Sequence, residues 1–268
     1  MGADDSIDKL EQVWGAVSAV GHTLSEEQWA STTDCPGWDV KDHVSHLIGT
    51  ERMLEGLPAS PASDAYGDHV KNPIGQFNEN ELDSRRSMSG ADVLAEFDAL
   101  AATRLASLRS GDEAYFARET MTPTGPGTVA DFLHIRVMDC YVHEQDIRRA
   151  VGQPGDLDTP AAAHSVDRLL RTIGIVVGKR AGAPEGSSVL FELTGPVART
   201  VPVTVTEGRA KVVDSVPDDL LTTVRMDSEA FLVLATGRRT AADLSDRWSV
   251  EGDEVTGRAI VEQLNMMI

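Results

Sequence analysis

The residues best suited to chemistry lie in the segment DCYVHEQDIRRAVG, residues 139–152, which otherwise has the apolar pattern of a buried helix. Asp139 and His143 are four residues apart, so their side chains share one face of that helix. A carboxylate and an imidazole placed in this way can bind the same metal ion. In a helical bundle the remaining ligands come from a facing helix, so this spacing predicts one half of a metal site.

The other half is expected on the helix that follows the CPGW turn at residues 35–38. This helix carries four candidate ligands: Asp42, His43, His46 and Glu51. Two histidines and a carboxylate leave coordination positions open, as a catalytic zinc site requires, and the same set suits non-haem iron. By helical periodicity His43 lies nearer the centre of the apolar stripe than His46, so periodicity alone favours His43.

The charged residues around His143 also have a structural interpretation. Carboxylates and arginines three or four residues apart on a helix are usually exposed ion pairs that contribute little to stability. On this interpretation Arg148 and Arg149 pair with Glu144 and Asp146, and Glu144 faces solvent. Alternatively, Asp146 accepts a hydrogen bond from a ligand imidazole and orients it.

Four long amphipathic helices are expected to position these residues. Apolar residues recur at three- and four-residue spacing, and Asp39 and Thr128 are suitable N-caps for the second and fourth helix. The helices are expected at residues 6–21, 39–54, 91–109 and 128–151. The stretches 58–76 and 122–127 are rich in Pro and Gly and are expected to form loops. Four long helices joined by irregular connections predict a four-helix bundle.

The second half of the chain has a different pattern. A helix is expected at about residues 160–180, and further helices near 228–236 and 254–266. Between them lie β-branched or alternating runs at residues 188–193, 199–206, 210–215 and 221–226. Strands followed by helices predict a small α+β domain. The Pro- and Gly-rich stretch 152–160 indicates the boundary, which gives an N-terminal domain at 1–156 and a C-terminal domain at 157–268.

Composition excludes several functions. The net charge of −19 over 268 residues repels phosphate backbones and anionic lipid, so we expect neither nucleic-acid nor membrane-surface binding. No apolar run is long enough to span a membrane, and the acidic N-terminus does not resemble a signal peptide. The two cysteines, Cys35 and Cys140, lie far apart and are expected to be small core residues. A reduced, cytoplasmic protein is therefore expected.

Two segments carry a family resemblance. CPGWDVKDHVSHLIGTE (35–51) and DCYVHEQDIRRAVGQPG (139–155) resemble the DinB/YfiT-like superfamily, and more narrowly its branch of mycothiol-dependent maleylpyruvate isomerase-like proteins. The chain beyond about residue 157 resembles the α+β C-terminal domain of that branch, which is related to sterol-carrier folds. The resemblance covers nearly the whole chain. It implies a DinB-like four-helix bundle followed by a small sterol-carrier-like α+β domain.

The resemblance also assigns site residues. It implies that His46, rather than His43, binds the metal together with Asp139 and His143. The isomerase itself is expected to have glutamate where this chain has Asp139, which is one methylene shorter. The C-terminal domain is expected to supply a cation for an anionic substrate, for which Arg238 is the first candidate and Arg225 its rival. Arg238 and Asp146 are thus the residues expected to assist catalysis.

The function implied is that of a metal-dependent enzyme that uses mycothiol. A thiol bound to a divalent metal, for which zinc is the first choice, ionises and attacks a small, anionic electrophile. The sequence leaves cis–trans isomerase and thiol transferase open, and monomer and homodimer equally. The alternative is a non-catalytic protein that binds a small ligand and has lost metal competence. A scaffold role is the third possibility.

Overall fold

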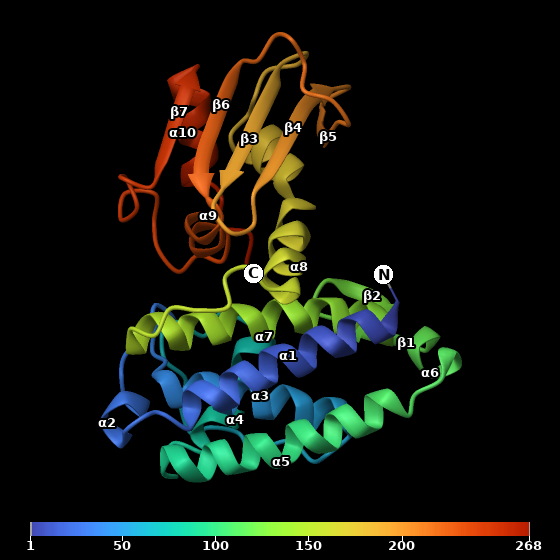
Figure 1. Ribbon diagram of the computed structural model, residues 1–268, viewed down its shortest axis with the longest axis vertical. Helices are drawn as coiled ribbons and strands as arrows, with labels where there is room; N and C mark the ends of the chain where they lie inside the picture. The colour runs from blue at the N-terminus through green and yellow to red at the C-terminus, as the bar shows by residue number, and fades with distance from the viewer. Residues whose placement is uncertain (1, 268) are drawn as a thin grey trace. The chain divides into compact units, whose positions relative to one another are not determined.

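The computed structural model describes residues 2–267 and divides the chain into two compact units, Met1–Asp156 and Leu157–Ile268. The first unit is built on four long helices (Figure 1): α1 (Ala3–Gly21), α3 (Val40–Leu54), α5 (Gly90–Arg109) and α7 (Val129–Val151). Helix α1 packs against α5 and α7, and α3 packs against the same two helices. The predicted bundle of four long helices is confirmed.

The ends of the two site helices are fixed by the expected caps. The Asp39 side chain accepts a hydrogen bond from the Asp42 amide at the start of α3, and Thr128 accepts one from Asp131 at the start of α7. Both are capping boxes, because the third helical residue bonds back to the cap in each case. Helix α7 ends at Gly152, whose φ of 67° is the left-handed conformation that glycine adopts without strain.

Shorter elements complete the first unit: α2 (Glu26–Trp29), α4 (Pro73–Asp83), α6 (Glu113–Ala117), β1 (Glu119–Thr122) and β2 (Gly125–Thr128). Two of these differ from the expected loops. Helix α4 begins within the stretch 58–76, where Asn72 caps it and Pro73 occupies its first turn. The stretch 122–127 belongs to a hairpin, because β1 and β2 pair antiparallel around it.

The second unit is a five-stranded sheet with helices. The strand order is β5-β4-β3-β6-β7, and only the pair β3·β6 is parallel. The strands are β3 (Ser188–Thr194), β4 (Arg199–Thr206), β5 (Arg209–Val212), β6 (Thr222–Asp227) and β7 (Trp248–Gly252). The helices are α8 (Pro160–Leu170), the π-helical turn η1 (Ile175–Arg180), α9 (Ser228–Ala235) and α10 (Glu254–Glu262). This mixed unit beside the helical bundle confirms the α+β class.

The second unit departs from the sequence pattern in three places. The helix expected over 160–180 is interrupted between α8 and η1, and the last helix ends at Glu262 rather than near residue 266. Strand β7 was not expected, because its alternation of apolar and polar residues extends over only four positions of WSVEG. The expected hairpin turn at Glu207 and Gly208 is present, with φ of 54° and 70° respectively.

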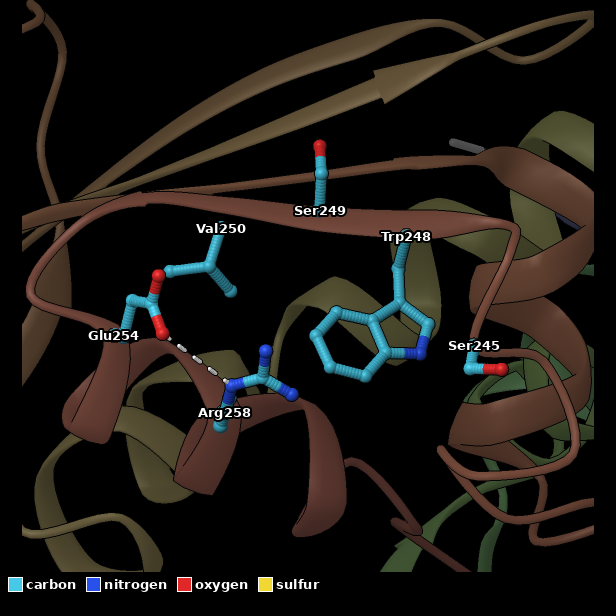
Figure 2. Close-up of a pocket in the computed structure, with 6 residues that line it drawn as sticks. All are labelled: Ser245, Trp248, Ser249, Val250, Glu254 and Arg258. Carbon is cyan, nitrogen blue, oxygen red and sulfur yellow. Dashed lines mark ion pairs between the residues drawn. The ribbon is translucent and has the colours of Figure 1, made fainter.

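A cavity of about 400 Å³ lies between β7 and α10 (Figure 2). Its lining residues are Ser245, Trp248, Ser249, Val250, Glu254 and Arg258. The Arg258 guanidinium lies 5.6 Å from the centre of the Trp248 ring, and its Nε lies 3.8 Å from a Glu254 carboxylate oxygen. None of the residues singled out in the sequence lines this cavity, so the candidate chemistry lies elsewhere.

Candidate metal centre

The interface between α3 and α7 brings the predicted metal ligands together. His46 Nε2 lies 3.1 Å from Asp139 Oδ2, and His143 Nε2 lies 3.6 Å from Asp139 Oδ1. The ligand atoms of the three residues all lie within 4.8 Å of one another. We call His46, Asp139 and His143 the outer triad. Although aspartate is one methylene shorter than glutamate, its carboxylate reaches both histidines.

The ionisation states of the outer triad are those that a metal requires. Burial lowers the pKa of His46, and the neighbouring Asp139 only partly offsets this effect. Burial alone would raise the pKa of Asp139, but Arg136 and His46 hold that pKa well below its usual range. At neutral pH the triad therefore offers a neutral imidazole beside an ionised carboxylate. Metal ions bind neutral imidazole and ionised carboxylate.

His46 is hydrogen-bonded through only one of its ring nitrogens, because Nε2 lies 3.1 Å from Asp139 Oδ2. Its Nδ1 atom is buried and has no hydrogen-bond partner. Buried side-chain polar atoms in proteins are nearly always paired, because an unpaired one loses its hydration without compensation. Protein contacts therefore leave one nitrogen of His46 unpaired, and the two imidazoles and the carboxylate of the outer triad are donors that fit a divalent metal.

A network of buried ion pairs holds the Asp139 carboxylate in position. Arg136 contacts Asp139 and donates from Nε to Glu51 Oε1 at 2.8 Å. The other Glu51 oxygen accepts from Arg104 Nε at 2.9 Å. Glu51 is thus occupied by two arginines and is not positioned as a ligand. Asp42, the other carboxylate candidate, lies at the start of α3 and pairs with Arg86.

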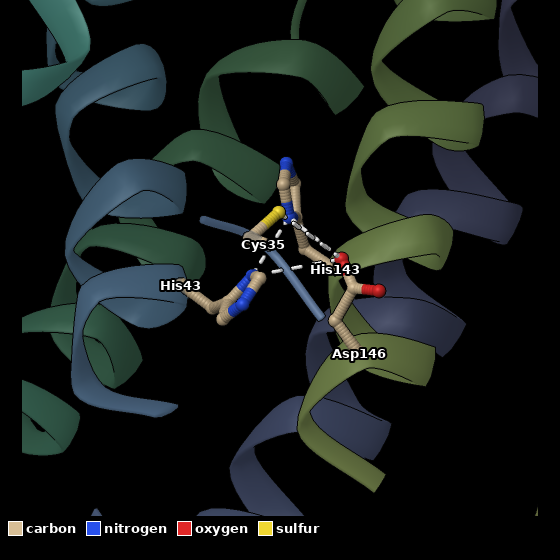
Figure 3. A group of neighbouring side chains, drawn as sticks. All are labelled: Cys35, His43, His143 and Asp146. Atoms are coloured by element: carbon tan, nitrogen blue, oxygen red, sulfur yellow. Dashed lines mark hydrogen bonds and ion pairs between the residues drawn. The ribbon is translucent and has the colours of Figure 1, made fainter. Parts of the chain in front are cut away.

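His43 lies on the other side of the His143 ring. Its Nδ1 is 2.8 Å from His143 Nδ1, which is itself 3.4 Å from Asp146 Oδ2 (Figure 3). The choice between His43 and His46 that periodicity and resemblance left open is therefore not exclusive, since His43 lies at the Nδ1 side of His143 and Asp139, the partner of His46, lies at its Nε2 side. Cys35, expected in the core, is half-buried, and its sulfur lies 3.9 Å from Asp146 Oδ2.

Trp38 covers the histidines. Its ring centre lies 5.4 Å from those of His43 and His46 and 5.6 Å from that of His143. The indole Nε1 donates to Glu79 Oε1 at 2.9 Å, which fixes the ring in place. An aromatic cover over a polar cluster limits the access of water and strengthens electrostatic interactions beneath it. Sequence reasoning missed this role, although Trp38 directly precedes the cap of α3.

Comparison with known proteins identifies the family of this chain. The family model described as "Mycothiol maleylpyruvate isomerase N-terminal domain" matches residues 10–148, and the model "MDMPI C-terminal domain" matches residues 162–257. The chain belongs to the mycothiol maleylpyruvate isomerase family. An uncharacterized protein found in two strains of Mycobacterium tuberculosis is 24% identical over 228 residues, which cover 82% of this chain and 80% of that protein.

Solved structures show the same fold. The crystal structure of the mycothiol-dependent maleylpyruvate isomerase matches with a TM-score of 0.57 at 15% identity, over 94% of this chain and 93% of that one. A histidine-to-alanine mutant of the isomerase matches with a TM-score of 0.58 at 14% identity, with the same coverage. The predicted family is confirmed, and the fold extends over both units of the chain.

In this family member the end of α7 is tied down by ion pairs. Arg149 contacts Asp146 and also Asp34, and Arg148 contacts Glu144 and Asp156, so both expected pairings are present. The expectation that Glu144 faces solvent is wrong, because its side chain is 1% exposed. Desolvation raises its pKa to about 7 although Arg148 opposes this shift.

The two candidate cations of the second unit have partners of their own. Arg238 follows α9, and its Nη1 donates to the Thr236 carbonyl at 3.0 Å. Arg225 lies on β6 and contacts Glu192 and Glu251, so its charge is already compensated. A role for Arg238 in binding an anionic substrate stays a prediction. No helix within residues 2–267 is both long enough and apolar enough to cross a membrane.

Proposed function

We propose that this chain is a metal-dependent enzyme that uses mycothiol as a thiol co-substrate against a small, anionic electrophile. The observation that carries the proposal is the outer triad, in which two imidazoles and a carboxylate converge in a buried interface. Three protein ligands leave at least one position open, as catalytic sites do. Family membership supports mycothiol as the thiol.

His46, Asp139 and His143 would hold a divalent ion, with zinc as the first choice. A bound divalent cation lowers the pKa of a coordinated thiol and so supplies a thiolate at neutral pH. Asp146 lies beside the Nδ1 atom of His143 and helps to orient that ring. Trp38 keeps water from the cluster, and Arg238 is proposed to bind the carboxylate of the substrate.

The remaining steps of the reaction take place between the thiolate and the electrophile. A carbon–sulfur bond would form at the electron-poor carbon of a carbon–carbon double bond, whose π electrons move to the adjacent carbon and its conjugated carbonyl group. Two outcomes follow from what happens to the carbon–sulfur bond, and in the first a proton from solvent completes the adduct. If this bond persists, the product is a thiol conjugate and the enzyme is a transferase. If it breaks after rotation about the former double bond, the enzyme is an isomerase and the thiol is regenerated.

The contact between Arg136 and Asp139 favours one alternative, a binding protein without metal chemistry. A guanidinium on the ligand carboxylate competes with a cation for the same charge. On this alternative the cluster is an ion-pair core and the protein binds a small ligand without turning it over.

Turnover distinguishes the two functions. Zinc-loaded protein is incubated with mycothiol and a panel of unsaturated carboxylates, including maleylpyruvate, and both thiol consumption and isomerised product are followed. We expect turnover that a chelator abolishes and that His46→Ala reduces by at least about 100-fold, as for loss of an essential group. The matched control is His22→Ala, because His22 is exposed and pairs only with Asp98 at the surface. Turnover that is indifferent to chelator and to His46→Ala would contradict the proposal.

A further inference from the structure

The Nδ1 side of His143 carries a second set of donors that the proposed reaction does not use. Cys35, His43, His143 and Asp146 each offer one ligand atom, and the four atoms lie within 4.8 Å of one another. Figure 3 shows the four side chains pointing toward one another, with His43 on α3 and the other imidazole and the carboxylate on α7. We call these four residues the inner tetrad.

The tautomer of His43 directs a lone pair into the inner tetrad. Thr33 Oγ1 donates its proton to the Trp38 carbonyl at 3.0 Å, so toward other groups it can only accept. With the hydroxyl proton directed at the Trp38 carbonyl, His43 Nε2, which lies 2.9 Å from the same oxygen, carries the ring proton and donates it to Thr33. Neutral imidazole has one N–H and one lone pair, so the lone pair is on Nδ1, the atom that faces His143.

The two carboxylate oxygens of Asp146 have different partners. Arg149 contacts Oδ1, while Oδ2 faces His143, His43 and Cys35. The side chain is fully buried, and Arg149 is itself anchored by Asp34. A carboxylate held by an outer partner, with its second oxygen directed inward, is the usual arrangement of a ligand carboxylate.

The distances suit a small ion. Four of the donor–donor separations are 2.8 Å, 3.4 Å, 3.8 Å and 3.9 Å. A tetrahedral zinc ion with ordinary bond lengths to nitrogen, oxygen and sulfur separates its donors by about 3.3 to 3.7 Å. Because all the donor atoms lie within 4.8 Å of one another, side-chain shifts of up to about one ångström would convert the inner tetrad into a complete tetrahedral set.

We propose that Cys35, His43, His143 and Asp146 form a second metal site, which is selective for a thiophilic divalent ion such as zinc. This second site competes with the outer triad for His143. Cys35 binds as thiolate, and its proton leaves to solvent. The competition follows from the imidazole itself, because the ring has one lone pair and can offer either Nδ1 or Nε2 but not both.

The two sites differ in what a bound ion can do. The inner tetrad supplies four protein ligands and leaves no open position, which is typical of structural zinc sites. An ion held there is chemically silent and removes His143 from the outer triad. This proposal does not depend on the use of mycothiol, since it concerns only where the ion is bound.

Cobalt spectroscopy tests the proposal directly. Chelator-treated protein is titrated with Co²⁺ in the absence of added thiol, and the near-ultraviolet thiolate-to-cobalt charge-transfer band is recorded. We expect this band in wild type, in the His46→Ala protein, or in both, because His46→Ala removes the competing site and leaves the inner tetrad intact. Cys35→Ser should abolish the band in either background.

Cys140→Ser is the matched control. Cys140 is also buried on α7 but contacts Trp14 and Arg136 outside the inner tetrad, so its loss should leave the band unchanged. Circular dichroism verifies that each variant is folded. The proposal is overturned if neither wild type nor His46→Ala shows the band, or if the band survives Cys35→Ser. Failure of the proposed reaction would instead appear in the turnover assay, which this spectrum does not use.

Discussion

The two units of the chain bury different kinds of side chain. Among residues 2–267, every buried Asp, Glu, Arg and Lys lies in the helical unit. The buried polar residues of the sheet unit are Ser, Thr and a single histidine, His164. Buried charges must be paired to be tolerated, and apolar residues of similar size often stabilise a core as well or better. The helical unit therefore concentrates the buried charges of the described residues, and those of the candidate site are part of that set.

The largest expected effect comes from breaking the buried chain of ion pairs. Arg136→Met leaves Asp139 and Glu51 without a shared partner, which we expect to destabilise the helical unit by about 3–5 kcal/mol. Urea unfolding followed by tryptophan emission measures this, because Trp14, Trp29 and Trp38 all lie in the helical unit.

The control for this variant is Arg199→Met in the sheet unit. Arg199 pairs with Asp167 at the surface, and loss of such a pair changes stability by about 0–1 kcal/mol. Equal losses in the two variants would show that the buried network has no special energetic role.

Metal binding should stabilise only the helical unit. At a free zinc concentration of about 100 times Kd, we expect a gain of about 2.7 kcal/mol in its free energy of unfolding. His143→Ala should abolish the gain, because both candidate sites use that ring. Hydrogen exchange followed by mass spectrometry resolves the two units, and slower exchange in β3 or β6 on zinc addition would contradict the assignment.

The pH dependence should also differ between units. Glu144 has a pKa raised to about 7, so the folded protein holds this proton more tightly than the unfolded chain does. The stabilisation is therefore complete at low pH and is lost as pH rises toward 7. Between about pH 5.5 and 8.5 we expect a loss of about 2 kcal/mol that Glu144→Gln removes.

Glu192→Gln is the control for this titration. Glu192 lies at the surface of the sheet unit, where it contacts Arg225. This variant should keep the pH dependence of the wild type. If the Glu144→Gln protein also keeps the pH dependence of the wild type, the burial of Glu144 has no consequence for stability.

The smallest expected effect is on the tryptophan fluorescence of the protein. Co²⁺ bound beneath Trp38 should quench the emission of this residue, which is one of four tryptophans in the chain. Trp38→Phe should remove the metal-dependent part of the quenching, while Trp29→Phe should retain it. Identical titrations for the two variants would place the ion away from Trp38.

Much of the helical unit follows from local sequence. Helix periodicity and the caps Asp39 and Thr128 depend on neighbouring residues only, so α3 and α7 could be placed before the structure was known. The i, i+4 spacing of Asp139 and His143 fixes their shared face in the same way. The convergence of these residues with His46 then needs only that the two helices face each other.

The remaining features depend on contacts distant in sequence. Glu144 is buried because the chain after α7 folds back, with Arg148 contacting Asp156 and Gln145 donating to the Gly155 carbonyl. Cys35 reaches Asp146 only because the CPGW turn closes against α7. Helical spacing in the sequence does not predict such contacts between distant segments of the chain. Strand β7 does alternate, but over four residues only and at the edge of the sheet, so the signal is too short to identify a strand on its own.

The central claim is that His143 is the shared ligand of a metal-binding protein. Equilibrium dialysis of chelator-treated wild type, His143→Ala and the surface control His22→Ala against zinc tests it most directly. We predict about one tightly bound zinc per chain in wild type and in His22→Ala, and none in His143→Ala, because the ring serves both ligand sets. Zinc bound equally by wild type and His143→Ala, or by neither, would contradict the account.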